Sequence, residues 1–244
     1  MNNLRCSLVV LIIMISMGVG HVYASALETA VSQGNALEVK RLLDNGADID
    51  WKPANGFTAL HEAVYTRQIG IASLLIQRGA DVNAKGTYGV VPLHMVKDKV
   101  IAELLISKGA DVNAWAKSRG TPLHSAVAHN VKDIAALLVE HGASHTAEDV
   151  YGTTPLHYAA GKGREEIAQL LISAGADVNL TNRDGYTPLH WAAGNGHVAI
   201  VDLLLRTNAD TAIKSSDGTT ALQRADSNGH REIVELLERH GVRE

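Results

Sequence analysis

A six-residue phrase recurs six times along this 244-residue chain at almost constant intervals. TPLHWA, which begins at Thr187, has counterparts that begin at Thr58, Val91, Thr121, Thr154 and Thr220. Successive copies are 33 residues apart, except that Val91 and Thr121 are separated by 30. A unit of this length buries its apolar side only against its neighbours, so the spacing predicts a stack of repeats.

Each repeat carries the signals of two short helices. Thr187 before Pro188 predicts a helix N-cap with proline at the first helical position. Leu189 and the alanines after it form the apolar side of a first helix, which Gly196 ends. Apolar residues three and four apart within 200–205 predict a second helix, and a GAD phrase then leads into an extended segment.

The period and the T-P-L-H-x-A phrase resemble those of the ankyrin-repeat family, over essentially the whole chain after residue 26. The resemblance implies an all-α ankyrin-repeat α-solenoid of about seven repeats, caps included, in which β-hairpin fingers join helix-turn-helix units. We expect one domain at 27–244, with an N-terminal cap repeat at 27–50, central repeats at 51–219 and a C-terminal cap repeat at 220–244. No second domain then remains to host an enzyme.

The first 26 residues have the features of a signal peptide. Arg5 precedes an apolar run at 8–19, and Ala24 and Ala26 form the small-x-small pattern of a cleavage site. Cleavage after Ala26 is favoured over cleavage after Ala24, and an uncleaved anchor is the alternative. We therefore expect an exported protein, periplasmic or else secreted, that is monomeric and not inserted in a membrane once cleaved.

Composition restricts the function further. The net charge of −4 becomes −5 when Arg5 is lost, and no run of Lys or Arg suggests nucleic acid as a partner. Cys6 is the single cysteine and lies in the expected signal peptide, so the mature chain would have no disulfide or thiolate site. The five motif histidines are one repeat apart, too far for a shared metal ion, and are expected to bond to cap threonines and neighbouring repeats. We expect no cofactor, no metal and no catalysis; a metal-dependent hydrolase is the remote alternative.

Two departures from the pattern stand next to each other. The repeat that begins at Val91 is three residues short and has lost its capping threonine, a change that typically costs about 1 kcal/mol. We predict a stunted first helix there. Arg119 occupies a position where other repeats have glycine, with Gly120 one place later. Residues 85–130 are therefore either tolerated drift or a functional kink or contact surface.

Aromatic residues are scarce, at 4%, and after residue 26 they lie in the extended segments and first helices. The resemblance to ankyrin repeats implies that these elements line the concave face where partners bind. Aromatic side chains are also enriched among binding hot spots. The position after the motif His or Gln also varies freely between repeats. The predicted partner-binding residues are Tyr65, Tyr88, Trp115, Arg119, Tyr151, Tyr158, Trp191 and Arg224.

These expectations define a non-catalytic protein-binding module that acts outside the cytoplasm. An inhibitor, immunity-type or accessory partner of another exported protein is one hypothesis. A secreted effector that binds a host protein is the alternative. Phe57 and Tyr186, just before the motif threonine, are interpreted as packing within their fingers.

Overall fold

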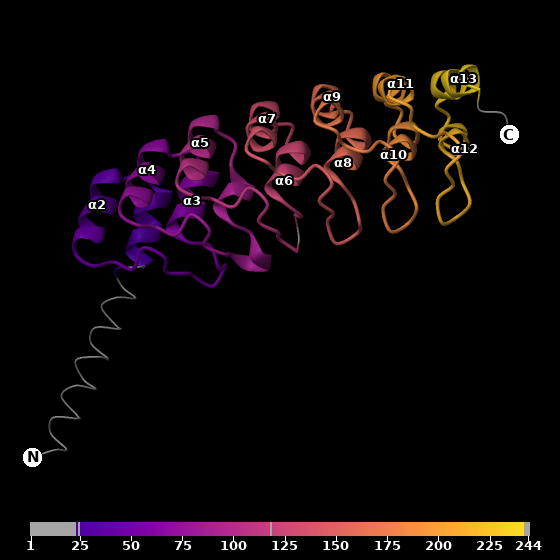
Figure 1. Cartoon of the computed structure of the whole chain (residues 1–244). Coiled ribbons are helices and arrows are strands. Elements are labelled where there is room, and N and C mark those ends of the chain that lie inside the picture. The colour runs from indigo at the N-terminus through magenta and orange to yellow at the C-terminus, as the bar shows by residue number, and fades with distance from the viewer. Residues whose placement is uncertain (1–22, 24, 118, 242–244) are drawn as a thin grey trace, which may run out of the picture. The chain divides into compact units, whose positions relative to one another are not determined.

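The computed structural model describes residues 23, 25–117 and 119–241. The predicted apolar run at 8–19 therefore lies outside the described residues. The chain forms two compact units: unit 1 ends at Asp111 and unit 2 begins at Val112. In each unit, repeats consist of a short first helix followed by a longer second helix (Figure 1).

In unit 1, residues 25–32 are helical, so the favoured cleavage point after Ala26 lies within a helical segment. The unit continues with α2 (Ala36–Asp44), α3 (Ala59–Tyr65), α4 (Ile69–Gln77), the 3-10 turns η1 (Thr87–Gly89) and η2 (Pro92–Met95), and α5 (Lys99–Ser107). Unit 2 contains α6 (Pro122–Ala128), α7 (Lys132–Glu140), α8 (Pro155–Gly161), α9 (Glu165–Ser173), α10 (Pro188–Gly194), α11 (Val198–Arg206), α12 (Ala221–Ser227) and α13 (Arg231–Arg239). The all-α repeat fold is confirmed.

The threonine and proline of the motif start the first helices as the sequence predicts. Thr154 is extended, with φ −90° and ψ 165°, and Pro155 takes the first helical position. α8 ends after seven residues, and Gly163 at φ +67° turns the chain into α9. A non-glycine residue at that φ is uncommon, which explains the glycine between most helix pairs.

The core of each repeat lies between its own two helices and those of the next repeat. Leu156 and Ala159 of α8 are completely buried, as are Ile167 and Leu171 of α9. α8 packs against α10, and α9 packs against α11. Burial of each leucine or isoleucine contributes about 1.5–3 kcal/mol, so neighbouring repeats stabilise one another.

The segments expected as β-hairpin fingers are tight turns, and no strand occurs among residues 25–117 and 119–241. In one finger the Asn182 N–H donates to Tyr186 O at 2.9 Å, which leaves too short a loop for a ladder of strand pairs. The Arg183 N–H donates to Tyr151 O of the preceding finger at 3.0 Å. Neighbouring fingers are therefore linked by backbone hydrogen bonds although neither is a strand.

The stunted helix predicted after Val91 is confirmed. η2 has four residues where the first helices elsewhere have seven. The Val91 N–H still donates to His94 Nδ1 at 3.2 Å, so the turn starts normally. The three missing residues remove the rest of the helix, and Asp98 caps the start of α5 instead.

The finger with Arg119 closes differently from the others. Gly152 and Gly185 have φ +72° and +76°, whereas here the positive φ, +66°, belongs to Gly120. Ala116 and Gly120 form an isolated antiparallel bridge. The left-handed residue of this finger is therefore Gly120, one position later than in the other fingers, and Arg119 does not need a positive φ. Whether this segment is a functional contact stays a prediction.

Candidate protein-interaction site

The motif histidine of α8 is fixed by hydrogen bonds at both ring nitrogens. His157 Nδ1 lies 2.8 Å from Thr154 Oγ1 and accepts from the Thr154 N–H at 3.3 Å. Nε2 therefore carries the proton and donates to Tyr186 O in the next repeat, at 2.9 Å. Burial lowers the pKa of His157 to about 4, against the weaker opposing effect of this hydrogen bond. The ring is neutral at pH 7 and joins two repeats.

Other motif histidines make the same contacts, as the sequence predicted. Nε2 of His61, His124 and His190 lies 3.0, 2.9 and 3.1 Å from Val90 O, Thr153 O and Thr219 O. Burial likewise lowers the pKa of all three rings, that of His61 to about 4. These histidines are part of the scaffold. Within the described part of the chain, no group of three His, Cys, Asp or Glu side chains is placed to hold a metal ion.

The residue after the motif histidine forms a row along the first helices of unit 2. The Tyr158 ring stands edge-on to His124, 5.7 Å between centroids, and Trp191 stands edge-on to His157 at 6.0 Å. The rings of Tyr158 and Trp191 are themselves 6.3 Å apart. The structure thus brings two of the predicted partner-binding residues together as neighbouring aromatic side chains.

Trp191 also packs against the preceding repeat. A Cβ on Gly161 would lie 2.5 Å from Trp191 Cε3, so only glycine at the end of α8 leaves room for the indole. Arg224 relates to Gly194 in the same way, with its Nε 2.8 Å from a Cβ built there. Both glycines have ordinary φ values, so close packing is the reason for them. Trp191 and Arg224 are half-buried and have a structural role besides any role in binding.

Two phenol hydroxyls fix this face to aspartates in the fingers. Tyr158 Oη donates to Asp149 Oδ2 at 3.0 Å, and Asp149 Oδ1 accepts from the N–H groups of Tyr151 and Thr153. Burial and Asp149 raise the pKa of Tyr158 to about 12. The site is therefore pre-organised, with few side chains left to order on binding.

Tyr186 and Asp217 form the second such pair. Tyr186 Oη donates to Asp217 Oδ2 at 2.8 Å, and hydrogen bonds from Ser215, Thr219 and Tyr186 hold the pKa of Asp217 well below its usual value. The Arg224 guanidinium lies over the Tyr186 ring, 4.4 Å from its centroid. Sequence reasoning assigned Tyr186 to packing and missed both aspartates. The motif pattern could not reveal them, because each pairing crosses between a helix and a finger or between fingers.

The remaining candidates are more exposed. Trp115 is 48% exposed, and its indole N–H donates to Glu148 O at 3.1 Å; Tyr151 is 67% exposed and Arg119 is also exposed. In unit 1, Tyr65 and Tyr88 are 51% and 66% exposed, and Lys97 Nζ lies 4.9 Å from the Tyr65 ring centroid. We call the surface formed by Trp115, Tyr151, Tyr158, Tyr186, Trp191 and Arg224 the aromatic face of unit 2.

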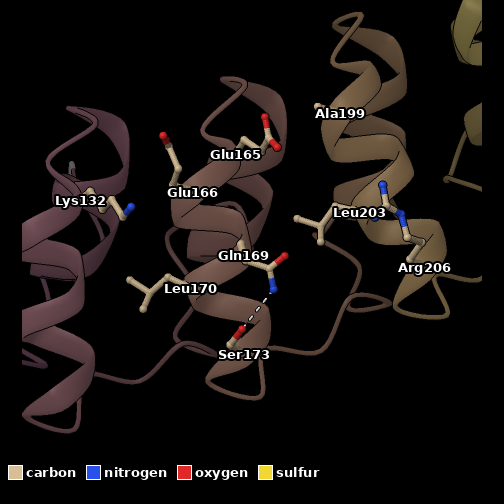
Figure 2. A pocket seen from close by; sticks show the side chains of 9 residues that line it. All are labelled: Lys132, Glu165, Glu166, Gln169, Leu170, Ser173, Ala199, Leu203 and Arg206. Atoms are coloured by element: carbon tan, nitrogen blue, oxygen red, sulfur yellow. Dashed lines mark hydrogen bonds between the residues drawn. The ribbon is translucent and has the colours of Figure 1, made fainter.

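The second helices of unit 2 border a separate groove with a cavity volume of about 470 Å³ (Figure 2). It is lined by Lys132, Glu165, Glu166, Gln169, Leu170, Ser173, Ala199, Leu203 and Arg206. Leu170 and Leu203 extend from neighbouring helices, and Gln169 Nε2 donates to Ser173 Oγ at 3.2 Å. Its mixture of leucines and opposite charges offers contact area and no nucleophile with an adjacent base.

The chain is a series of helix pairs, and the repeated motif residues cap the helices and join neighbouring repeats. This arrangement defines a repeat scaffold, and such scaffolds are protein–protein interaction modules. The chain belongs to the ankyrin-repeat family. Three copies of the family model, described as "Ankyrin repeats (3 copies)", match residues 3–86, 93–182 and 174–243. Ankyrin repeats are in general non-catalytic interaction scaffolds that bind a protein partner.

Solved and curated proteins share these repeats. The ankyrin repeat domain of Bcl-3, a member of the IkappaB protein family, has a TM-score of 0.75 at 30% identity, covering 87% of this chain and 97% of that one. The chain is 46% identical to delta-latroinsectotoxin-Lt1a of Latrodectus tredecimguttatus over 63 residues, 25% of this chain and 5% of the toxin. It is 36% identical to the 2-5A-dependent ribonuclease of Mus musculus over 69 residues, 28% of this chain and 9% of the ribonuclease. It is 34% identical to the potassium channel AKT1 of Arabidopsis thaliana over 71 residues, 29% of this chain and 8% of the channel. The chain thus spans less than a tenth of each of these three curated relatives.

No helix among the described residues is both long enough and apolar enough to span a bilayer.

Proposed function

We propose that this chain is a non-catalytic binding module that holds a protein partner on the aromatic face of unit 2. The observation that carries the proposal is the fixed pair Tyr158 and Trp191, whose ring centroids are 6.3 Å apart and whose side chains remain partly exposed. Trp115 and Tyr151 add exposed aromatic area from the fingers. Rigid aromatic side chains bind at a low entropic cost, which favours recognition without chemistry.

The binding is proposed to occur outside the cytoplasm. The support is the sequence of residues 1–26, with its positive start, apolar run and small-x-small site. An inhibitor, immunity-type or accessory partner of another exported protein fits a module retained in a periplasm. A secreted effector that engages a host protein is the second candidate. N-terminal sequencing of the mature protein, with its distribution between osmotic-shock fluid and medium, separates these; an intact N-terminus in the cytosolic fraction contradicts export.

The binding surface is tested by cross-linking and mass spectrometry on native cell envelopes. Trp115→Ala with Tyr151→Ala removes exposed rings without opening the core, since both side chains are about half exposed or more. The matched control is Tyr88→Ala, an equally exposed finger tyrosine in unit 1. We expect the double variant to lose its cross-linked partner and the control to keep it. A partner that survives the double variant and disappears with Tyr88→Ala would place the site in unit 1.

A further inference from the structure

Unit 1 has an exposed apolar row on its second helices. The exposed large aliphatic side chains among the described residues are Leu37, Ile69 and Val100, at 83%, 41% and 54% exposure. Each lies at the first or second residue of its helix, in α2, α4 and α5 respectively. α2 packs against α4 and α4 against α5, so the starts of these three helices, which carry the three residues, follow one another along the unit. Figure 1 shows the three helices in this order. We call this row the apolar edge.

Three of the four corresponding helix starts in unit 2 are charged, and the fourth, that of α11, begins with Val198 and Ala199. α7 begins with Lys132 and Asp133, α9 with Glu165 and Glu166, and α13 with Arg231 and Glu232. Charged side chains at helix starts are the ordinary choice for a surface facing water. The aliphatic row is therefore a property of unit 1, and stacking of repeats does not require it.

Gly70 forms a notch in the middle of the apolar edge. It is exposed, in the second position of α4, and so corresponds to Leu37 in α2 and Val100 in α5. Its φ is not in the left-handed range, and a Cβ built on it meets nothing within 4 Å. Neither a turn nor close packing accounts for glycine, which is among the least favourable residues within a helix. The space it leaves lies between two apolar side chains.

Charges around the apolar edge favour an acidic partner. Arg67 is exposed two residues before Ile69, Lys40 is exposed one turn after Leu37, and Lys97 precedes α5. The nearby acids are already engaged within the chain. Glu38 pairs with Arg41 at 2.6 Å, Asp98 accepts from the N–H groups of Val100 and Ile101 as an N-cap, and Glu103 lies 3.7 Å from Lys99.

Helix geometry adds to this preference. Of the three helix N-termini at this edge, that of α4 has no side-chain cap and no acidic residue in its first turn, so its dipole favours negative charge close by.

We propose that the apolar edge binds an acidic amphipathic helix of a partner protein. Packed helices are about 8–10 Å apart, so Leu37 and Val100 are separated by roughly 20 Å across two repeat steps. Seven residues of an α-helix rise about 10.5 Å, so leucines at heptad spacing match the step between repeats. One partner side chain enters the Gly70 notch while Leu37 and Val100 contact its neighbours, and acidic residues along the flank meet Arg67, Lys40 and Lys97.

The test uses the full chain and a synthetic helix as the probe. The helix is a capped, fluorescein-labelled peptide of about 18 residues, long enough to cover three repeats, with heptad leucines and flanking glutamates. A twin with lysine in place of each glutamate tests charge, and a scrambled peptide tests the apolar pattern. Fluorescence anisotropy is expected to give saturable binding of the acidic helix, weakened by salt, and at least about tenfold weaker binding of either control.

Variants locate the binding. Leu37→Ser with Val100→Ser removes the apolar contacts, and Gly70→Trp fills the notch; each is expected to weaken the acidic helix at least about tenfold. Ala199→Trp is the matched control, because Ala199 is the exposed second residue of α11 in unit 2, and it should leave binding unchanged. Circular dichroism checks that each variant is folded, which the exposure of these positions favours.

Three results overturn the proposal: the scrambled peptide binds as well as the acidic helix, the variants bind as well as the original chain, or Ala199→Trp weakens binding as much as Gly70→Trp. A lipid surface is excluded in the same series with phosphatidylglycerol vesicles. If vesicles bind the chain, lose that binding with Leu37→Ser and Val100→Ser, and the acidic helix does not bind, the edge recognises lipid and the proposal is wrong.

Discussion

The buried histidine of α8 makes a sharp prediction about stability and pH. His157 is fully buried, and the Thr154 N–H donates to its Nδ1, the nitrogen that would have to take up the added proton. Protonation would direct an N–H at another N–H donor in a buried site. His157→Gln removes the ionisable ring. The chain already has glutamine at the equivalent position of another repeat. In the last repeat Gln223 Oε1 accepts from the Thr220 N–H at 3.0 Å and so replaces the histidine in the cap.

The magnitude follows from the pKa of His157, which burial lowers from its usual 6.5 to about 4. Because the folded-state pKa is the lower one, the stability contribution is complete above pH 6.5 and is lost as the pH falls towards 4. The full loss is about 3 kcal/mol, of which about 2 kcal/mol falls between pH 7 and pH 5. His157→Gln removes this contribution, so its stability should fall less over that interval, by about 2 kcal/mol.

The assay is urea unfolding of both chains at pH 7 and pH 5, followed by circular dichroism. We expect His157→Gln to be less stable than the original chain at pH 7, since the hydrogen bond from Nε2 to Tyr186 O is weakened or lost. The difference in unfolding free energy between the two chains should become smaller at pH 5. Gln223→His is the matched control: position 223 is exposed, so a histidine there should add little dependence on pH. An equal fall in stability for the original chain and His157→Gln would refute a buried neutral ring at 157.

Three further predictions concern packing, helix capping and backbone conformation. Gly161→Ala places a methyl group 2.5 Å from Trp191 Cε3, so urea unfolding should show a loss of about 1–3 kcal/mol although alanine favours helix; a gain would contradict the packing, and Trp191→Leu should rescue most of the loss. Val91→Thr supplies the missing hydroxyl beside the motif histidine and should stabilise unit 1 by about 0.5–1 kcal/mol; an unchanged Tm would mean that the shortened turn does not use the cap. Gly120→Ala forces a side chain into φ +66° and should cost more than about 1 kcal/mol, whereas Arg119→Ala should change stability by less than about 0.5 kcal/mol; equal effects would show that the glycine position does not matter.

Much of the fold could be predicted from the sequence because most repeats carry the same local signals for helix starts and turns. Thr154 and Pro155 start a helix, Leu156 faces inward and Gly163 permits the turn, and each of these is decided within a few residues of chain. The shortened helix after Val91 was predictable for the same reason, since missing residues and a missing cap are both local. Because the same pattern occurs in six copies, the prediction of each helix pair was more reliable than one copy alone would allow.

Side-chain contacts made by the fingers were harder to predict. The partner of Tyr158 Oη is Asp149, nine residues earlier in a finger, and the partner of Tyr186 Oη is Asp217 in the following finger. The path of the finger decides the first contact and the offset between stacked fingers decides the second, and no motif encodes either. The fingers are likewise tight turns, because backbone hydrogen bonds between residues four apart, such as Asn182 and Tyr186, close the loops before a ladder of strand pairs can form. The apolar edge was not evident either, since Leu37, Gly70 and Val100 align only once the helix starts are known.

The varying position after the motif histidine shows how far such a pattern can be interpreted. Variation there suggested freedom from stacking, yet Trp191 requires Gly161 and Arg224 requires Gly194 in the preceding repeat. The partner is glycine in both pairs, so a large side chain at this position packs where the preceding repeat ends its first helix with glycine. Trp191 therefore has a structural role, and only the exposed part of its side chain is available to a partner. Loss of binding on Trp191→Ala would mix the two roles, whereas Trp115 and Tyr151, which are more exposed, separate recognition from folding.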